Sequence, residues 1–120
     1  MNYAYITKND MLNGEGLRVT LWVTGCPHHC DGCHNAWSWN PDEGKHFDHE
    51  AYLELINELK HDYIDGITFL GGEPLAPYNL DTVTSITKSS FSSLVAAIWK
   101  RIVSNSAPDT SFTKPFLINI

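Results

Sequence analysis

The clearest hydrophobic pattern in the chain is a strict alternation over residues 17–24, Leu-Arg-Val-Thr-Leu-Trp-Val-Thr. Apolar side chains occupy every second position of this segment, and a period of two is typical of a β-strand with one buried face. Gly14 and Gly16 come just before it and suit a tight turn into the strand. The pattern therefore predicts a strand, with Arg18 on its polar and solvated side.

A helical pattern follows over residues 48–59. Its apolar positions, 52, 55, 56 and 59, are spaced so that they fall on one face of a helix. Asp48 is suited to cap the N-terminus of this helix, and Glu50 suits its first turn. We therefore expect an amphipathic helix that begins next to Asp48.

A second strand is predicted at Ile67–Leu70, which has the composition of a short buried strand. Strand, helix and strand in this order predict a βα unit with two parallel strands, and therefore an α/β fold. In such folds the functional loops usually lie at the carboxyl ends of the parallel strands. Candidate chemistry is thus expected directly after residue 24 and directly after residue 70.

All three cysteines of the chain lie after the first strand, in Cys26-Pro-His-His-Cys30-Asp-Gly-Cys33, which we call the cysteine loop. Three thiols cannot all pair as disulfides, whereas thiolates are soft ligands that favour zinc or iron–sulfur clusters. A closed structural zinc site usually has four protein ligands, and three ligands with an open position are typical of a site that does chemistry. The loop therefore predicts an iron–sulfur cluster that is held by three cysteines and has one open position.

A zinc site is the alternative, with His28, His29 or His34 as its fourth ligand. The spacing C-x3-C-x2-C is not common for zinc, and a zinc site gives no role to the residues that follow the second strand. We therefore favour the cluster.

Those residues are Gly71, Gly72, Glu73 and Pro74, which we call the Gly-Gly-Glu-Pro turn. Two glycines in a row let a cofactor lie against the backbone at the end of a strand. Glu73 can hold a positively charged group of such a cofactor, and Pro74 fixes the turn. The alternative is a plain turn between a strand and a helix.

Together these motifs resemble the radical S-adenosylmethionine superfamily, through the C-x3-C-x2-C loop and a strand that ends in Gly-Gly-Glu-Pro. The local sequence around these motifs resembles the activating proteins of anaerobic ribonucleoside-triphosphate reductases. It consists of Asn-Gly-Glu-Gly-Leu-Arg over residues 13–18, Thr-Gly-Cys over 24–26 and Gly-Cys-His-Asn over 32–35. Gly32 stands where the broad superfamily usually has an aromatic residue. The resemblance covers roughly residues 1–80.

The resemblance implies a fold, cofactors and site residues. The fold would be α/β, an incomplete (βα) barrel of parallel strands with crossover helices. Cys26, Cys30 and Cys33 would hold a [4Fe-4S] cluster whose fourth iron chelates S-adenosylmethionine. The backbone around Gly32, Cys33 and His34 would contact this cofactor, as would the Gly-Gly-Glu-Pro turn. One electron would then split the cofactor into methionine and a 5′-deoxyadenosyl radical.

The implied activity is that of an oxidoreductase, a glycyl-radical activating enzyme. The deoxyadenosyl radical would take a Cα hydrogen from a glycine in the large subunit of an anaerobic ribonucleotide reductase, and a flavodoxin-like protein would supply the electron. Three alternatives stay open: an activase of another glycyl-radical enzyme such as pyruvate formate-lyase, a non-catalytic cluster- or zinc-binding module, and a remnant without activity.

The composition changes after residue 81, where eight of the nine serines lie between residues 85 and 111. Residues 82–93 are rich in β-branched and hydroxyl side chains, which are weak helix formers. A helical face of Phe91, Leu94, Val95, Ile98 and Ile102, a loop over 104–114 and a strand over 115–120 are expected beyond them.

We expect one domain over residues 1–120, family-like over 1–80 and divergent over 81–120. Family members are longer and carry a further strand with a Trp-Thr-Gly-Tyr-like motif, which does not occur in this sequence. Either the C-terminus is truncated or frame-shifted from near Lys88, or the tail is divergent and functional.

Charge and hydropathy limit the partners. The chain has 120 residues and a net charge of −6, which argues against nucleic acid. The N-terminus lacks the pattern of a signal peptide, and the longest apolar run, 94–99, is far shorter than the roughly 20 residues of a membrane span. We therefore expect no membrane partner and a cytoplasmic protein, since reducing conditions keep thiols available to a metal.

The remaining candidates have less specific interpretations. His28 and His29 either tune the cluster through hydrogen bonds or, as we favour, lie in a solvated loop. His34 packs against the adenine of the cofactor or makes a plain loop contact. The other aromatic and histidine side chains are expected to pack or to lie at the surface: Trp37 and Trp39 in the core or at an interface, and His46, His49 and His61 at the surface.

Overall fold

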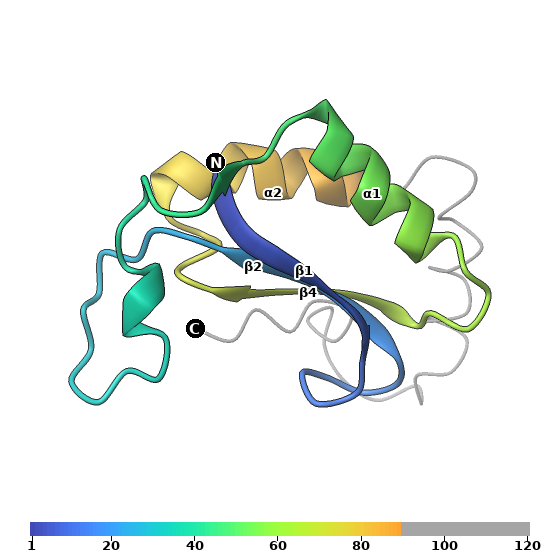
Figure 1. Cartoon of the computed structure of the whole chain (residues 1–120), viewed down its shortest axis with the longest axis horizontal. Coiled ribbons are helices and arrows are strands. Elements are labelled where there is room, and N and C mark those ends of the chain that lie inside the picture. The colour runs from blue at the N-terminus through green and yellow to red at the C-terminus, as the bar shows by residue number, and fades with distance from the viewer. Residues whose placement is uncertain (90–120) are drawn as a thin grey trace.

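A computed structural model describes residues 1–89 of the chain (Figure 1). It contains a four-stranded sheet in the order β3-β1-β2-β4, two α-helices and one 3-10 helix. In chain order these elements are β1 (Asn2–Asp10), β2 (Arg18–Val23), η1 (Ala36–Ser38), β3 (Lys45–His46), α1 (His49–Leu59), β4 (Gly66–Gly71) and α2 (Pro77–Ser89). The helix, loop and strand predicted over 91–102, 104–114 and 115–120 lie outside the described residues.

Strands β2 and β4 form the predicted parallel pair. They pair in register from Arg18 opposite Gly66 to Val23 opposite Gly71, so their carboxyl ends coincide. Helix α1 connects them, which confirms the predicted βα unit. Asp48 caps α1 as predicted, because its side chain accepts a hydrogen bond of 3.0 Å from the backbone N–H of Ala51. The wider barrel stays a prediction.

Strand β1 was not predicted from the sequence. It pairs antiparallel with both β2 and β3, so the described sheet is mixed. Its register with β2 shifts twice, between Tyr3 and Tyr5 and between Thr7 and Asp10. Each shift interrupts the alternation of inward and outward side chains, so this strand lacks the period of two that reveals β2.

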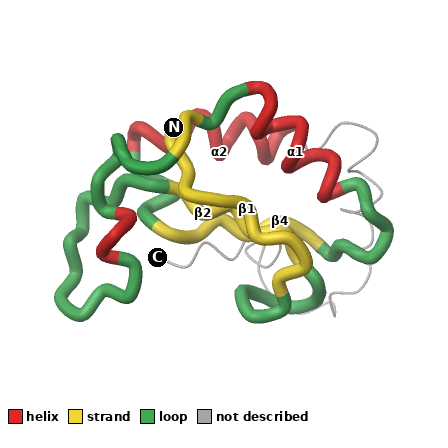
Figure 2. Tube along the Cα trace, in the orientation of Figure 1, coloured by secondary structure: helices red, strands yellow, loops and turns green. Residues whose placement is uncertain are grey.

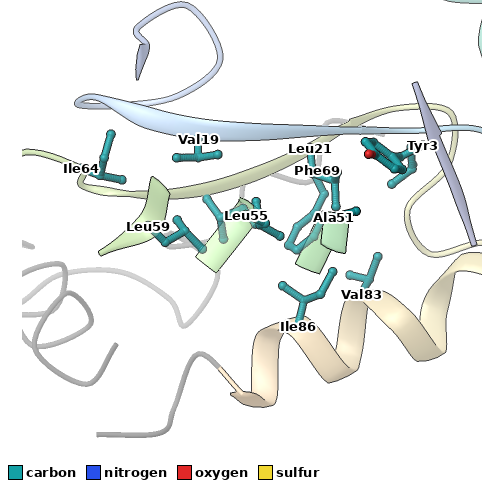
Figure 3. Close-up of a cluster of buried hydrophobic side chains, with 12 residues drawn as sticks. Tyr3, Val19, Leu21, Ala51, Leu55, Leu59, Ile64, Phe69, Val83 and Ile86 are labelled. Carbon is teal, nitrogen blue, oxygen red and sulfur yellow. The ribbon is translucent and has the colours of Figure 1, made fainter. Parts of the chain in front are cut away.

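Both helices lie on the same side of the sheet (Figures 1 and 2), and the hydrophobic core fills the space between the helices and the sheet. Figure 3 shows side chains of α1 and α2 directed towards those of the sheet. The members from the strands include Val19, Leu21 and Phe69, and those from the helices include Leu55 and Ile86. The alternating positions of β2 and the apolar face of α1 therefore meet here, as their periods predict.

Arg18 is a correction to the sequence analysis, because its residue is only 5% exposed instead of solvated. Its Nε donates to Thr68 Oγ1 at 2.6 Å and its Nη2 to the carbonyl of Ile67 at 2.6 Å. On the same side of the sheet, the hydroxyl of Thr20 donates to Asp10. Backbone carbonyls of the loop between β1 and β2 accept hydrogen bonds from Arg18 and Thr68 on this side, so the polar half of the alternation is buried and hydrogen-bonded.

Helix α2 is a second correction, because residues 82–93 were judged weak helix formers and those up to Ser89 are helical. Pro77 occupies the first helical position, where its missing N–H costs little. Val83 and Ile86 are buried against the core, and this packing outweighs the weak helix propensity of the neighbouring threonines and serines. Within residues 1–89, no helix has the length and apolar character needed to cross a membrane.

Replacing the cap residue tests the account of α1. Asp48→Ala is expected to lower the free energy of unfolding by about 1 kcal/mol, since it leaves the N–H of Ala51 without its partner. Urea unfolding followed by circular dichroism measures this. Asp42→Ala, a change of an exposed aspartate outside the helix, is the control. Equal effects of the two substitutions would contradict the capping role.

Candidate metal centre

The two sequence motifs meet at the carboxyl ends of β2 and β4, although they are far apart in the chain. The backbone N–H of Gly72 donates to the carbonyl of Val23 at 2.9 Å, and that of Glu73 donates to the carbonyl of Gly25 at 2.8 Å. These bonds continue the parallel pairing beyond the strands. The start of the cysteine loop is therefore bound to the Gly-Gly-Glu-Pro turn before any metal is considered.

Glycine is required at this junction because the neighbouring backbone fills the space of a side chain. A Cβ on Gly71 would collide with the carbonyl oxygen of Val23, and one on Gly72 with that of Gly25. Gly71 also has a φ of 104°, which disfavours other residues. The two glycines thus have a structural reason within the chain itself, and their predicted approach to a cofactor stays a prediction.

The base of the cysteine loop is held from a second direction by residues 38–43. The N–H of Gly25 donates to the carbonyl of Ser38 at 2.7 Å, and that of Cys26 donates to the carbonyl of Trp39 at 2.9 Å. The hydroxyl of Thr24 donates to the carbonyl of Glu43 at 2.9 Å. Cys26, the first expected ligand, therefore starts from a fixed backbone position.

Asn79 of α2 completes the junction and was not identified from the sequence. It is fully buried, and its side-chain amide donates to the carbonyls of Thr24 at 3.0 Å and Glu73 at 2.9 Å. One side chain therefore joins the residue before the cysteine loop to the Gly-Gly-Glu-Pro turn. The sequence did offer one signal for Asn79: it is a polar residue near the start of the segment that directly follows the Gly-Gly-Glu-Pro turn.

The tip of the cysteine loop extends beyond the ends of the strands (Figure 1). Cys26 and Cys33 are half-buried, Cys30 is exposed, and all three thiols are free. The N–H of Cys33 donates to the carbonyl of Cys30 at 3.2 Å, so these two lie on one turn. His29 and Gly32 take positive φ values of 46° and 72°, which curl the tip.

Among residues 1–89, no three cysteine, histidine, aspartate or glutamate side chains are gathered as a ready set of metal ligands. The donor chemistry nevertheless fits an iron–sulfur cluster, because three thiols that form no disulfide lie on one short loop, whose backbone is hydrogen-bonded to the neighbouring elements only at its base among the described residues. Metal binding commonly supplies the free energy that gathers such ligands. The three thiols are therefore suited to close around a cluster.

The histidines of the loop have other partners or face solvent. The Nε2 atom of His28 lies 3.2 Å from Glu73 Oε2, so the interpretation of His28 as a solvated loop residue is wrong in part. The ring of His29 packs on Trp39 at a centroid distance of 4.6 Å. His34 is exposed, which leaves its two interpretations open.

Glu73 is the buried charge of the site, with a side chain that is 7% exposed. Its Oε1 accepts a hydrogen bond of 2.8 Å from the N–H of Leu75, which orients the carboxylate within its own turn. Pro74, which follows it, is fully buried. The carboxylate of Glu73 is therefore oriented and largely shielded from water, and the backbone of the same residue is bound to the base of the cysteine loop. A carboxylate held in this way is suited to bind a cation.

Tyr78 forms a wall of the site that the sequence did not reveal. Its ring fills the space beside Gly25, where a Cβ would collide with it, and Gly25 has a φ of 90°. Burial raises the pKa of Tyr78, and the charges that Cys26 and Glu73 carry when ionised add to this effect. The phenol therefore lies within electrostatic reach of both an expected metal ligand and the buried carboxylate.

The two tryptophans lie outside the hydrophobic core, so their predicted packing in the core is wrong and a place at an interface stays a prediction. Trp37 is exposed and stacks on Tyr5 with centroids 6.2 Å apart, while Trp39 is half-buried under His29. His46, His49 and His61 are exposed, as predicted. None of these three contributes to the site at the strand ends.

A fold with a three-cysteine loop at the carboxyl end of a parallel strand defines a cluster-binding domain, and the family comparison agrees. The chain belongs to the family described as "4Fe-4S single cluster domain", whose model matches residues 12–106. No solved structure matches the chain.

The similar proteins are named anaerobic ribonucleoside-triphosphate reductase-activating protein. The one from Enterobacteria phage T4 is 43% identical over 86 residues, which are 72% of this chain and 55% of that protein. The one from Haemophilus influenzae is 45% identical over 85 residues, 69% of this chain and 55% of that protein. The one from Escherichia coli K12 is 37% identical over 90 residues, 73% and 58% respectively.

These matches confirm the resemblance of the motifs to activating proteins of anaerobic ribonucleoside-triphosphate reductases. They also show that this chain spans little more than half the length of the curated relatives it matches.

A substitution at Gly72 tests the junction. Gly72→Ala is expected to lower the free energy of unfolding of the metal-free protein by about 2–3 kcal/mol, because its Cβ would meet the backbone carbonyl of Gly25. Urea unfolding measures this. Gly32→Ala is the control, since a Cβ there meets nothing within 4 Å and is penalised by its φ of 72° alone. A Gly72→Ala cost no larger than that of the control would contradict the junction.

Proposed function

We propose that the chain is a glycyl-radical activating enzyme that acts on an anaerobic ribonucleoside-triphosphate reductase. The observation that carries the proposal is the hydrogen-bonded junction that joins a three-cysteine loop to a Gly-Gly-Glu-Pro turn at the ends of two parallel strands. The names of the relatives support the choice of reductase. The proposal extends those names to a chain that covers part of their length.

Cys26, Cys30 and Cys33 are the proposed ligands of a [4Fe-4S] cluster. Cys26 is anchored through its backbone N–H to the carbonyl of Trp39, while Cys30 and Cys33 lie together on one turn beyond this anchor. Three protein ligands leave one iron without a protein donor. That iron is the proposed site of S-adenosylmethionine.

The proposed cofactor residues are those around the open side of the cysteine loop. They are Gly32, Cys33 and His34 of the loop, with Gly71, Gly72, Glu73 and Pro74 of the turn. Glu73 suits the ammonium group of S-adenosylmethionine because its carboxylate is buried and oriented. When bound, cluster and cofactor supply a one-electron cleavage to methionine and a 5′-deoxyadenosyl radical, which takes a glycine Cα hydrogen and leaves 5′-deoxyadenosine.

The proposed fold is an incomplete (βα) barrel. Strand β4 supports it, because residues 66–70 are buried while β4 lies at the edge of the described sheet. A strand buried in this way is typical of the interior of a parallel sheet with further strands beyond it. The open side of the barrel would receive the glycine-bearing loop of the reductase large subunit. A flavodoxin-like electron donor and a cytoplasmic location complete the proposal.

Product analysis tests the function. The protein is loaded anaerobically with iron and sulfide, reduced, and mixed with S-adenosylmethionine and the reductase that the phage T4 relative activates. The proposal predicts 5′-deoxyadenosine and a protein glycyl radical, detected by chromatography and electron paramagnetic resonance. Product without a glycyl radical would reassign the partner, and a loaded cluster without product would reject the enzyme.

A ligand substitution tests the cluster. Cys30→Ala is expected to reduce bound iron and sulfide to background, because two thiolates cannot hold a cluster that needs three. Metal and sulfide analysis of the loaded protein measures this. Asp31→Ala, the next residue of the same exposed loop, should retain the wild-type content. A Cys30→Ala protein that still carries four irons would refute the ligand assignment.

A further inference from the structure

The side chain of His28 connects the tip of the cysteine loop to Glu73. Its Nε2 atom lies 3.2 Å from Glu73 Oε2, while Glu73 Oε1 accepts the N–H of Leu75. An ionised carboxylate only accepts hydrogen bonds, so the imidazole must donate from Nε2. The side chain of Glu73 is 7% exposed and that of His28 is 52% exposed. The contact therefore joins a buried acceptor to a donor from the loop surface.

The contact between His28 and Glu73 lies in the part of the cysteine loop that makes no backbone hydrogen bond to a neighbouring element among the described residues. The backbone hydrogen bonds that tie the loop to the rest of the described chain end at Cys26. Beyond it, two side chains hold the tip: His28 on Glu73 and His29 on the ring of Trp39. His28 lies between the first two expected cluster ligands. Its orientation therefore affects both the cysteines and the carboxylate.

We propose that His28 is a positioning residue for the cofactor site, holding the Glu73 carboxylate towards the cysteine loop so that the ammonium group of S-adenosylmethionine binds both elements at once. This inference rests on the proposed function. A carboxylate has about four lone-pair directions, so Glu73 can accept from His28, Leu75 and an ammonium together. His28 thus fixes the geometry of an acceptor and does not compete with the cofactor for it.

The first experiment measures the affinity of the cluster-loaded protein for radiolabelled S-adenosylmethionine by equilibrium dialysis. His28→Ala is expected to raise the Kd about tenfold, the scale of one hydrogen bond to a charged group, with iron content unchanged. His28→Gln places an amide donor near the position of Nε2 and should restore most of the affinity. Asp31→Ala, which changes an exposed residue of the same loop, is the matched control and should change the Kd less than twofold.

A second experiment uses the metal-free protein and needs no cofactor. Alkylation of the half-buried Cys33 by iodoacetamide, followed by mass spectrometry, reports how firmly the loop tip is held. His28→Ala and Glu73→Ala should each accelerate the reaction severalfold and by a similar factor. The double variant should react no faster than either, because both substitutions remove the same contact.

The outcomes separate this inference from the proposed function. Wild-type affinity in His28→Ala overturns the inference and leaves the function standing. If the wild-type protein binds no S-adenosylmethionine, the proposed function fails, and alkylation decides on His28. Non-additive acceleration then retains His28 as the residue that positions Glu73, whereas additive effects or none overturn it.

Discussion

The rest of the site depends on the close backbone contact between the ends of β2 and β4. Hydrogen bonds from Gly72 and Glu73 to the chain just before Cys26 bring together two segments that are separated by an entire helix. The contact is possible because no side chain stands at Gly71 or Gly72. It decides where the cysteine loop begins and where the buried carboxylate lies. A shift at this point would move both motifs relative to each other.

Around this junction the structure divides the cysteine loop into a base held by backbone hydrogen bonds and a tip held by side-chain contacts of His28 and His29. The base is bound by the Gly-Gly-Glu-Pro turn, by the backbone of residues 38–43 and by the buried amide of Asn79. The tip carries Cys30 and Cys33, and its curl relies on two residues with positive φ. Such a division suits a metal whose binding free energy orders the last ligands. In the proposed site the protein would fix the position of Cys26, and the metal would gather the other two thiols around it.

The sequence predicted the elements with an undisturbed period and failed where another effect interfered. Strands β2 and β4, helix α1 and its cap at Asp48 follow directly from hydrophobic spacing and capping chemistry. Strand β1 escaped because its register shifts break the period, and α2 because tertiary packing outweighs weak helix propensity. Arg18 was wrongly predicted to be solvated, because its burial depends on contacts with the loop between β1 and β2 and with β4, which the alternation within β2 does not encode.

The site was predicted in the same uneven way. The cysteines and the Gly-Gly-Glu-Pro turn are visible as motifs, and the parallel pairing predicts that they meet. The contacts of Asn79, Tyr78 and His28 depend on how side chains from separate elements approach one another, which no local spacing encodes.

The central claim is a three-cysteine cluster with one iron left open to a cofactor, and Mössbauer spectroscopy of the protein loaded with iron-57 tests it most directly. The account predicts a [4Fe-4S] spectrum in which one iron in four changes its isomer shift when S-adenosylmethionine is added, since that iron alone lacks a thiolate. A spectrum that the cofactor leaves unchanged, or a protein that holds no cluster at all, would contradict the account.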